Sequence, residues 1–124
     1  MPAGGVGLDL CSADRIRRVH ERHGSRFLER VYTSGERSLA MRRRDPYPAL
    51  AARWAAKEAV IKVLGMPEGF RWTDIEVVLD ERGRPHIALH GVMLGIACGV
   101  ELSCSISHEG DTAACVVLAR EESR

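Results

Sequence analysis

The chain has 124 residues, which fits one domain and leaves little room for two. Lys and Arg total 18 and Asp and Glu total 17, so the formal net charge is +1, and general attraction to nucleic acid or to an anionic membrane is not implied. No apolar run approaches the roughly 20 residues of a membrane helix, and the first residues lack the features of a signal peptide. These observations predict a soluble cytoplasmic protein, with residues 1–124 forming a single domain.

The first part of the chain predicts one strand followed by helices. Residues 6–10 alternate apolar with small or acidic residues, which is typical of a strand. Ser12 is a suitable N-cap for a helix over residues 13–23, and Gly24 ends that helix. A short helical segment then begins at Ser25.

Two further helices are predicted before the middle of the chain. Thr33 and Glu36 have the spacing of a capping box and open a helix that continues to about residue 42. The basic loop 42–48 contains two prolines, which break this helix. The longest predicted helix spans 49–64. It is apolar nearly all round, so we expect it to be largely buried.

The charged residues of this long helix do not form a single solvent-exposed stripe. At the helical rotation per residue, Arg53 and Lys57 point one way, and Glu58 and Lys62 point about 140° away. Charges in a buried helix need partners. Either Glu58 and Lys62 pair with each other at the favourable i,i+4 spacing, or these charges meet a ligand.

The second half of the chain is rich in predicted strands. Turn residues over 80–85 and 108–111 predict two hairpins, with a short helix over 92–98 between them. Helices in the N-terminal half followed by mainly antiparallel strands indicate an α+β fold with the helices packed on the sheet. The expected strands are 75–79, 86–90, 101–107 and 112–118.

The cysteines and several well-known motifs give mostly negative information. No cysteine spacing matches a metal-binding CxxC pair, and most of the cysteines lie in apolar segments, so we expect buried free thiols rather than a disulfide. The sequence has no zinc-binding His/Cys cluster, no GxSxG motif and no complete dinucleotide-binding or P-loop fingerprint. The four cysteines are Cys11, Cys98, Cys104 and Cys115.

Two carboxylates and a lysine are candidates for a site that binds metal and phosphate. Asp9 lies near the end of the first strand and Glu58 lies on the buried helix. Mg²⁺ takes one or two protein carboxylates together with waters and phosphate oxygens, and Lys62 could neutralise phosphate charge. From spacing alone, the simpler explanation is a helix ion pair between Glu58 and Lys62 and an unrelated strand aspartate.

Two basic features have open interpretations. His108 ends the segment Ser105-Ile106-Ser107-His108, where it could contact a phosphate or a sugar or be a turn histidine without a ligand. The arginine-rich helix over 13–23 is either a solvated face or a dock for an acidic protein. RNA binding by this helix is a third interpretation, although no aromatic stacking platform accompanies it.

Five motifs occur in a set order along the chain. The longest, Arg53-Trp54-Ala55-Ala56-Lys57-Glu58-Ala59, is followed by Lys62 and is the most specific. The other four are Gly5-Val6-Gly7-Leu8-Asp9-Leu10, Arg15-Ile16, Arg26-Phe27 and Ser105-Ile106-Ser107-His108. In their order and spacing these motifs resemble those of the holo-acyl-carrier-protein synthases, the small trimeric class of 4′-phosphopantetheinyl transferases. The resemblance runs from about Gly5 to Leu118.

The resemblance implies a 4′-phosphopantetheinyl transferase-like fold and a specific reaction. Family members transfer the phosphopantetheine group of coenzyme A to a serine of an acyl carrier protein and release adenosine 3′,5′-bisphosphate, in support of fatty-acid or polyketide biosynthesis. Asp9 and Glu58 match the metal ligands, with Mg²⁺, or Mn²⁺ as the alternative, at the pyrophosphate. Lys62 matches the phosphate-binding lysine, and Glu58 could accept the serine proton, directly or through a metal-bound water. The implied catalytic residues are Asp9, Glu58 and Lys62.

The resemblance also implies binding surfaces and an assembly. The matching positions are Arg53, Lys62 and His108 for coenzyme A and Arg15, Arg22 and Phe27 for docking of the carrier protein. Family members are usually homotrimers whose active sites form between subunits, and neither nucleic acid nor membrane is an expected partner. Two rival hypotheses stay open: a non-catalytic trimer that holds coenzyme A, a nucleotide or a carrier protein, and an RNA-binding basic helix.

Overall fold

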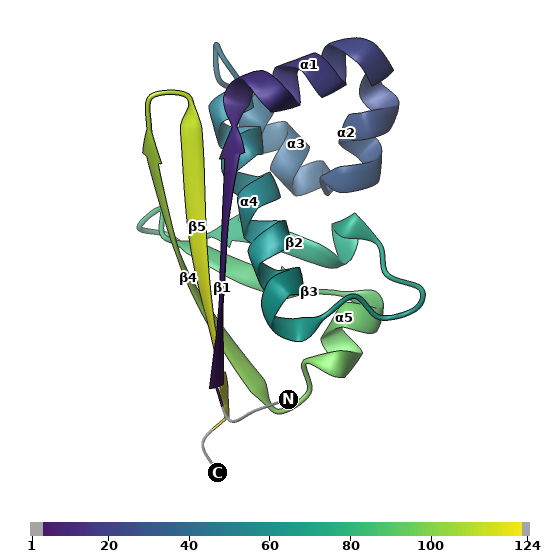
Figure 1. Cartoon of the computed structure of the whole chain (residues 1–124). Helices are drawn as coiled ribbons and strands as arrows, with labels where there is room; N and C mark the ends of the chain where they lie inside the picture. The colour runs from purple at the N-terminus through teal and green to yellow at the C-terminus, as the bar shows by residue number, and fades with distance from the viewer. Residues whose placement is uncertain (1–3, 123–124) are drawn as a thin grey trace.

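The computed structural model describes residues 4–122 and places the helices on one side of a curved antiparallel sheet (Figure 1). Three strands form this sheet and two more form a separate hairpin. The expected α+β arrangement is confirmed. In chain order the elements are β1 (Gly4–Ser12), α1 (Ala13–His23), α2 (Ser25–Val31), α3 (Ser34–Met41), α4 (Tyr47–Leu64), the 3₁₀ helix η1 (Trp72–Asp74), β2 (Ile75–Leu79), β3 (Pro85–Leu89), α5 (Gly91–Ile96), β4 (Val100–Glu109) and β5 (Thr112–Glu121).

The three-stranded sheet pairs the first strand of the chain with the last. β5 lies between β1 and β4 and is antiparallel to both. Asp9 on β1 lies opposite Cys115 on β5. Because strand residues alternate between faces, Gly7, Cys11 and Cys115 turn toward the helical side and are buried there. Asp9 shares this inner face.

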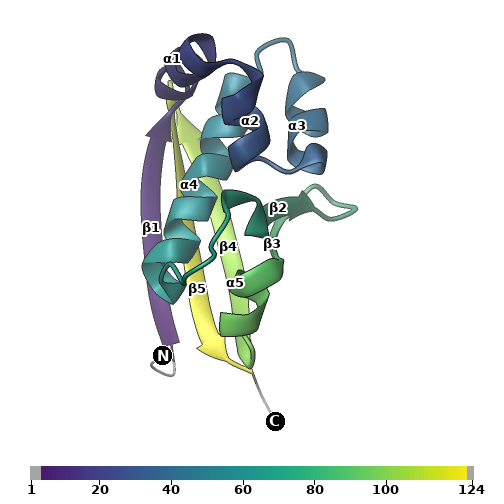
Figure 2. The same cartoon turned by 90° about the vertical axis from the view of Figure 1, so that its right-hand side faces the viewer.

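Helix α4 lies along the inner face of the sheet (Figures 1 and 2). Its residues Ala55, Ala56 and Ala59 are fully buried, and their small side chains let the helix approach the strands closely. The approach is closest at Gly7, where an added Cβ atom would lie only 2.1 Å from the carbonyl oxygen of Ala59. Helices α1 to α3 surround one end of α4, and the β2–β3 hairpin and α5 lie toward the other.

The opposite face of the sheet is apolar and bare. All helices of the described chain lie on the inner side (Figure 2). Val6, Leu8 and Leu10 of β1 and Leu118 of β5 face outward and are 53–63% exposed. A contiguous apolar surface of this kind is typical of a face that contacts another protein.

One ion pair is fully buried between the helices and the hairpin. Lys57 Nζ donates to Glu36 Oε1 at 2.8 Å, and both side chains are inaccessible to solvent. The same ammonium also donates to the carbonyl oxygens of Trp72 and Ile75. Burial lowers the pKa of Lys57, and the carboxylate of Glu36 opposes this shift. Lys57, one of the helix charges that needed a partner, therefore finds it on α3 and has a structural role.

The predicted helices and strands are confirmed with some shifts at their ends. α1 has the predicted bounds, and the hydroxyl of Ser12 accepts the Arg15 N–H at 3.1 Å. The capping box of Thr33 and Glu36 is present. α4 begins at Tyr47, earlier than predicted, because Pro48 in the first turn lacks only an N–H that a helix start leaves unpaired. The short helix η1 was not predicted.

The four cysteines are free, as expected. Cys11 and Cys115 are buried and Cys104 is partly buried, whereas the expectation of burial is wrong for Cys98. α5 ends at Ile96, before the predicted helix end, and Cys98 is left exposed in the turn that leads to β4. None of the helices between residues 4 and 122 combines the length and apolarity needed to cross a membrane.

Candidate active site

The C-terminal half of α4 faces β1 and forms a cluster of charges with it. Lys62 extends from α4 to the strand, where its Nζ donates to the carbonyl oxygen of Leu8 at 2.8 Å and to Asp9 Oδ1 at 3.1 Å. The Asp9 side chain is mostly covered, whereas Lys62 is half-exposed. Lys62 thus pairs with a strand residue, and no ion pair joins it to Glu58 within residues 4–122. The helix pair considered from the sequence is wrong, because the strand offers a closer carboxylate.

Glu58 is a partly buried carboxyl group at the centre of this cluster. Burial raises its pKa above the ordinary value, and the negative charge of Asp9 raises it further. The positive charges of Arg15 and Lys62 act in the opposite direction. The structure therefore brings together the three residues predicted to be catalytic. It also adds Arg15, which the sequence predicted only as a docking residue.

Local sequence features explain why these groups meet. Alternation along β1 puts Gly7 and Asp9 on the same inner face. Gly7 lets the backbone of α4 lie directly on the strand. Glu58 and Lys62 are four residues apart and so project from the same side of α4. The absence of a side chain at Gly7 therefore sets the separation between the strand carboxylate and the helix charges.

The oxygen donors of the cluster suit one class of metal ion. Asp9 and Glu58 supply carboxylates, which are preferred by Mg²⁺. Across residues 4–122 no group of three or more His, Cys, Asp or Glu side chains could hold a metal ion. Mg²⁺ usually keeps several waters and takes one or two carboxylates together with substrate phosphates. Two carboxylates beside a lysine therefore fit Mg²⁺ bound with a phosphate group, whereas the described residues form no closed all-protein metal site.

Arg53 and His108 lie in a different place, a cleft of about 270 Å³ between α4, the β2–β3 hairpin and β4. The Arg53 side chain is 7% exposed, and its Nη1 donates to the carbonyl oxygen of Ala49 at 3.1 Å. Its buried Nε has no hydrogen-bond partner in the described part of the chain. The pKa of Arg53 is lowered by burial, and the negative charge of Glu36 only partly opposes this shift. A buried guanidinium without a carboxylate contact is a strong candidate for binding an anion.

The cluster of Asp9, Glu58 and Lys62 and this cleft, which holds Arg53 and His108, have no residues in common. Arg43 also lines it, which adds a second guanidinium. The predicted coenzyme A residues are thus divided within one chain: Lys62 lies in the cluster, and the other two lie in the cleft.

The residues predicted to dock a carrier protein lie on α1 and α2, beside the cluster. Arg22 is exposed near the end of α1. The guanidinium carbon of Arg15 lies 5.9 Å from the centre of the Trp54 ring. Phe27 packs against Tyr32 and Trp54, with ring centroids 6.1 and 6.4 Å apart, and lines a depression of about 430 Å³. Basic side chains and an aromatic floor therefore share this surface.

Trp54 has a position at the site that the sequence analysis did not assign. It precedes Glu58 by four residues and so lies on the same side of α4. Its ring stacks on Trp72 with centroids 4.9 Å apart, and its buried Nε1 has no hydrogen-bond partner in the described chain. The helical spacing to Glu58 was the available signal. The stacking on Trp72 joins segments that no local pattern connects.

Comparisons with known proteins agree with this geometry. The model of the 4′-phosphopantetheinyl transferase superfamily matches residues 5–117. A holo-[acyl-carrier-protein] synthase of Myxococcus xanthus is 46% identical over 123 residues, which cover 95% of each chain. The synthase of Caldanaerobacter subterraneus is 41% identical over 118 residues, which cover 92% of each chain.

Solved structures give the same result. A synthase from Chronobacterium ammoniagenes in complex with coenzyme A superposes with a TM-score of 0.84 at 36% identity, covering 98% of this chain and 99% of that one. The synthase of Neisseria meningitidis superposes with a TM-score of 0.85 at 30% identity, covering 94% of this chain and 98% of that one. The predicted fold and family are therefore confirmed. The chain belongs to the 4′-phosphopantetheinyl transferase superfamily, among the holo-[acyl-carrier-protein] synthases.

Proposed function

We propose that this chain, acting as a single transferase domain, moves the 4′-phosphopantetheine group of coenzyme A to a serine of an acyl carrier protein. Adenosine 3′,5′-bisphosphate is the leaving product. The observation that carries the proposal is the meeting of Asp9, Glu58 and Lys62 between β1 and α4, in a chain whose relatives are named for this reaction. The carrier protein is one of fatty-acid or polyketide synthesis, and the reaction takes place in the cytoplasm.

The three charged residues have distinct roles in the transfer. The serine hydroxyl attacks the β-phosphorus of coenzyme A, so catalysis consists mostly of positioning and charge neutralisation. Glu58 accepts the serine proton, and burial together with the negative charge of Asp9 raises the pKa of this carboxyl group. Lys62 stabilises negative charge that develops on the phosphate oxygens. Asp9 holds the Lys62 ammonium at the site.

Asp9 and Glu58 would also hold the metal ion of the reaction, Mg²⁺ or alternatively Mn²⁺. The fit rests on their proximity, because the charge of Asp9 raises the pKa of Glu58, and on their oxygen donors. When bound, the ion polarises the pyrophosphate and neutralises part of its charge. The shortage of protein ligands leaves room for the phosphate oxygens of the substrate.

The nucleotide part of coenzyme A binds in the cleft of Arg53 and His108. The buried guanidinium of Arg53 lacks an anionic partner, and the 3′-phosphate of coenzyme A supplies one. Lys62 contacts the pyrophosphate. Because one chain keeps the cleft and the cluster apart, we infer that the cleft of one subunit completes the cluster of its neighbour.

This division of the site requires an oligomer, and we infer a homotrimer. Support comes from the bare outer face of the sheet, where Val6, Leu8, Leu10 and Leu118 expose apolar surface. Burial of such surface stabilises an assembly by about 25 cal/mol for each Å² removed from water. Active sites then lie at the subunit boundaries.

The carrier protein docks on α1 and α2. Carrier proteins are acidic, so the exposed arginines Arg15 and Arg22 raise the rate of encounter even though the net charge is only +1. Phe27 offers an apolar contact between these charges and Trp54. Arg15 joins docking to catalysis, because it lies beside both Trp54 and Glu58.

Intact-mass spectrometry tests the proposed reaction. An apo carrier protein is incubated with this protein, coenzyme A and Mg²⁺, with and without a chelator. The expected result is a mass gain of one phosphopantetheine group that the chelator prevents. Glu58→Gln and Asp9→Asn each abolish the gain while circular dichroism stays unchanged, and Glu81→Gln, in the exposed hairpin turn, serves as the control.

Two results would contradict the proposal. Full activity in both site variants would remove the cluster from the mechanism. Tight binding of coenzyme A without transfer to any carrier protein would favour a non-catalytic binding module.

A further inference from the structure

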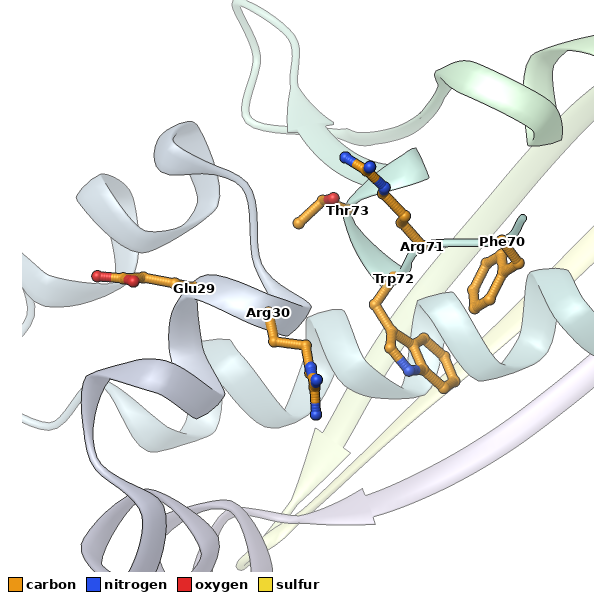
Figure 3. Close-up of a pocket in the computed structure, with 6 residues that line it drawn as sticks. All are labelled: Glu29, Arg30, Phe70, Arg71, Trp72 and Thr73. Carbon is orange, nitrogen blue, oxygen red and sulfur yellow. The ribbon is translucent and has the colours of Figure 1, made fainter.

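A second cleft opens between α2 and the segment that links α4 to β2 (Figure 3). Its volume is about 630 Å³, within the range of clefts that bind ligands. None of the residues assigned so far to metal, coenzyme A or carrier protein lines it. The lining residues are Glu29, Arg30, Phe70, Arg71, Trp72 and Thr73.

One wall of this cleft is aromatic and reaches toward the catalytic cluster. The ring of Phe70 meets that of Trp72 edge-on, with centroids 5.1 Å apart. Trp72 stacks in turn on Trp54, at an interplanar angle of 28°. Since Trp54 lies one helical turn before Glu58, the wall runs from the cleft to the proposed reaction centre.

Two arginines supply most of the charge of this cleft. Arg30 and Arg71 are both exposed, and no ion pair within residues 4–122 involves either of them. The acidic residue of the lining, Glu29, has its carboxylate 4.0 Å from Arg37 and points away from the aromatic rings (Figure 3). The cleft therefore offers two guanidinium groups without an ion pair: that of Arg30 extends on the side of the Trp72 ring, and that of Arg71 points away from the rings (Figure 3).

The cleft is continuous with the docking surface described above. Arg30 lines both this cleft and the depression that contains Phe27. His23 and Arg26 complete that depression, at the junction of α1 and α2. Basic and aromatic residues thus extend from α1 across α2 to the segment before β2.

We propose that this cleft is a second docking site for the carrier protein, which inserts an acidic segment bearing an apolar side chain. The inference rests on the proposed function. Acidic groups of the segment contact Arg30 and Arg71, and its apolar side chain packs on Phe70 and Trp72. Contacts on both sides of Trp54 fix the orientation of the carrier, and orientation is a large part of catalysis by positioning.

Steady-state kinetics of Arg30→Ala and Arg71→Ala test this site. Each exposed pair is worth about 1 kcal/mol or less, so KM for the carrier protein rises about two- to fivefold per variant. KM for coenzyme A and the urea midpoint stay unchanged. Arg71→Glu raises KM for the carrier protein further than Arg71→Ala does. Arg71→Lys keeps the positive charge, so at low salt it shows only a small part of the rise in KM seen with Arg71→Ala. Arg82→Ala, in the hairpin turn, is the matched control and leaves all constants unchanged.

The alternative occupant of the cleft is the pantetheine arm of coenzyme A, and binding measurements separate the two. If Arg71→Glu weakens binding of coenzyme A but not of adenosine 3′,5′-bisphosphate, the arm lies in the cleft and the proposal is overturned. An unchanged KM for the carrier protein in Arg71→Glu overturns it as well.

The failure of the proposed function would be visible separately, in the native chain. If that chain transfers nothing, the binding of apo carrier protein is followed directly by tryptophan fluorescence. Weaker carrier binding by Arg71→Glu than by the native chain then still supports the docking site, and equal binding refutes it.

Discussion

Replacement of Lys57 by methionine probes how the buried ion pair holds the helices to the β2–β3 hairpin. Lys57 Nζ lies 2.8 Å from Glu36 Oε1 and 3.2 Å from the carbonyl oxygen of Trp72, and it also donates to the carbonyl oxygen of Ile75. One ammonium thus joins α4 to α3, η1 and β2. Methionine keeps the length of the side chain and removes all these donors.

The expected loss follows from what the substitution leaves behind. The Glu36 carboxylate stays buried and keeps two N–H donors, from Thr33 and Val77, each at 3.0 Å. Removing one partner of a buried pair costs about 3–5 kcal/mol, because the remaining charge has lost its counter-charge. A domain has only about 5–15 kcal/mol of stability, so Lys57→Met should unfold at much lower urea concentration than the native chain.

A double-mutant cycle with Glu36→Gln separates the pair from the rest of the fold. Glutamine keeps an acceptor for one of the two backbone N–H groups and carries no charge, so the double variant no longer buries a lone carboxylate. We expect its loss to be smaller than the sum of the two single losses by about 0.5–3 kcal/mol.

Urea unfolding at one fixed protein concentration, followed by tryptophan fluorescence, measures all four proteins. The concentration is fixed because an assembly makes stability concentration-dependent. Additive losses, or a loss under 1 kcal/mol in Lys57→Met, would refute the structural role of the pair.

Three further predictions follow from other contacts. Gly7→Ala places a Cβ atom 2.1 Å from the carbonyl oxygen of Ala59, so it should lower the free energy of unfolding in urea by about 1–3 kcal/mol and slow transfer. Gly5→Ala is the control, because its Cβ atom meets Val63 at an ordinary 3.5 Å. Equal behaviour of the two variants would contradict the close approach at Gly7. Burial raises the pKa of Cys11 from 9.0 to about 11. As pH rises, the unfolded chain therefore loses this proton before the folded chain does. The contribution of Cys11 to the free energy of unfolding is present below pH 9 and is lost toward pH 11. The stability difference between the native chain and Cys11→Ala should thus shrink by about 2–3 kcal/mol across that range, and a constant difference would be evidence against the shift. Leu8→Glu on the bare sheet face should dissociate the proposed trimer in sedimentation velocity, whereas Leu94→Glu, equally exposed on α5, should not; a trimer that survives Leu8→Glu would place the interface elsewhere.

The parts of the fold that the sequence predicted well depend on contacts between near neighbours. Ser12 caps a helix whose first N–H groups lie three residues away, and the Thr33–Glu36 capping box is equally local. The turn before Pro85 likewise sets the β2–β3 hairpin. Such signals involve a few neighbouring residues and a single backbone geometry, so they can be recognised from the sequence alone.

Contacts between distant segments were not predictable in the same way. Lys57 meets Glu36 across a loop and a helix boundary, and several carboxylates elsewhere in the chain were equally eligible. Lys62 had a suitable partner four residues away in Glu58 and instead pairs with Asp9. Attraction between opposite charges is long-ranged and unspecific, so packing decides which residues pair. The close approach of α4 to β1 at Gly7 brings Asp9, rather than Glu58, within ion-pair distance of Lys62.

The candidate site itself came from the family resemblance rather than from spacing. A strand aspartate and a helix glutamate 49 positions apart have no pattern that distinguishes a metal site from coincidence. The motifs supplied that link, and the structure added the neighbourhood of Arg15 and Trp54. Aromatic stacking of Trp54 on Trp72 has no periodic signature, which is why the second cleft was not anticipated.

The arrangement of α4 explains why one helix can serve two sites. Its rotation turns Arg53 toward the cleft that His108 also lines and Glu58 toward β1, with buried alanines between them that keep the helix against the sheet. A single chain cannot then bring Arg53 to its own Glu58 without turning the helix and exposing its core. Under the proposed function, transfer therefore depends on assembly: dissociated subunits should retain the carboxylate cluster and still lose the reaction, because the anion-binding half of each site belongs to a neighbour.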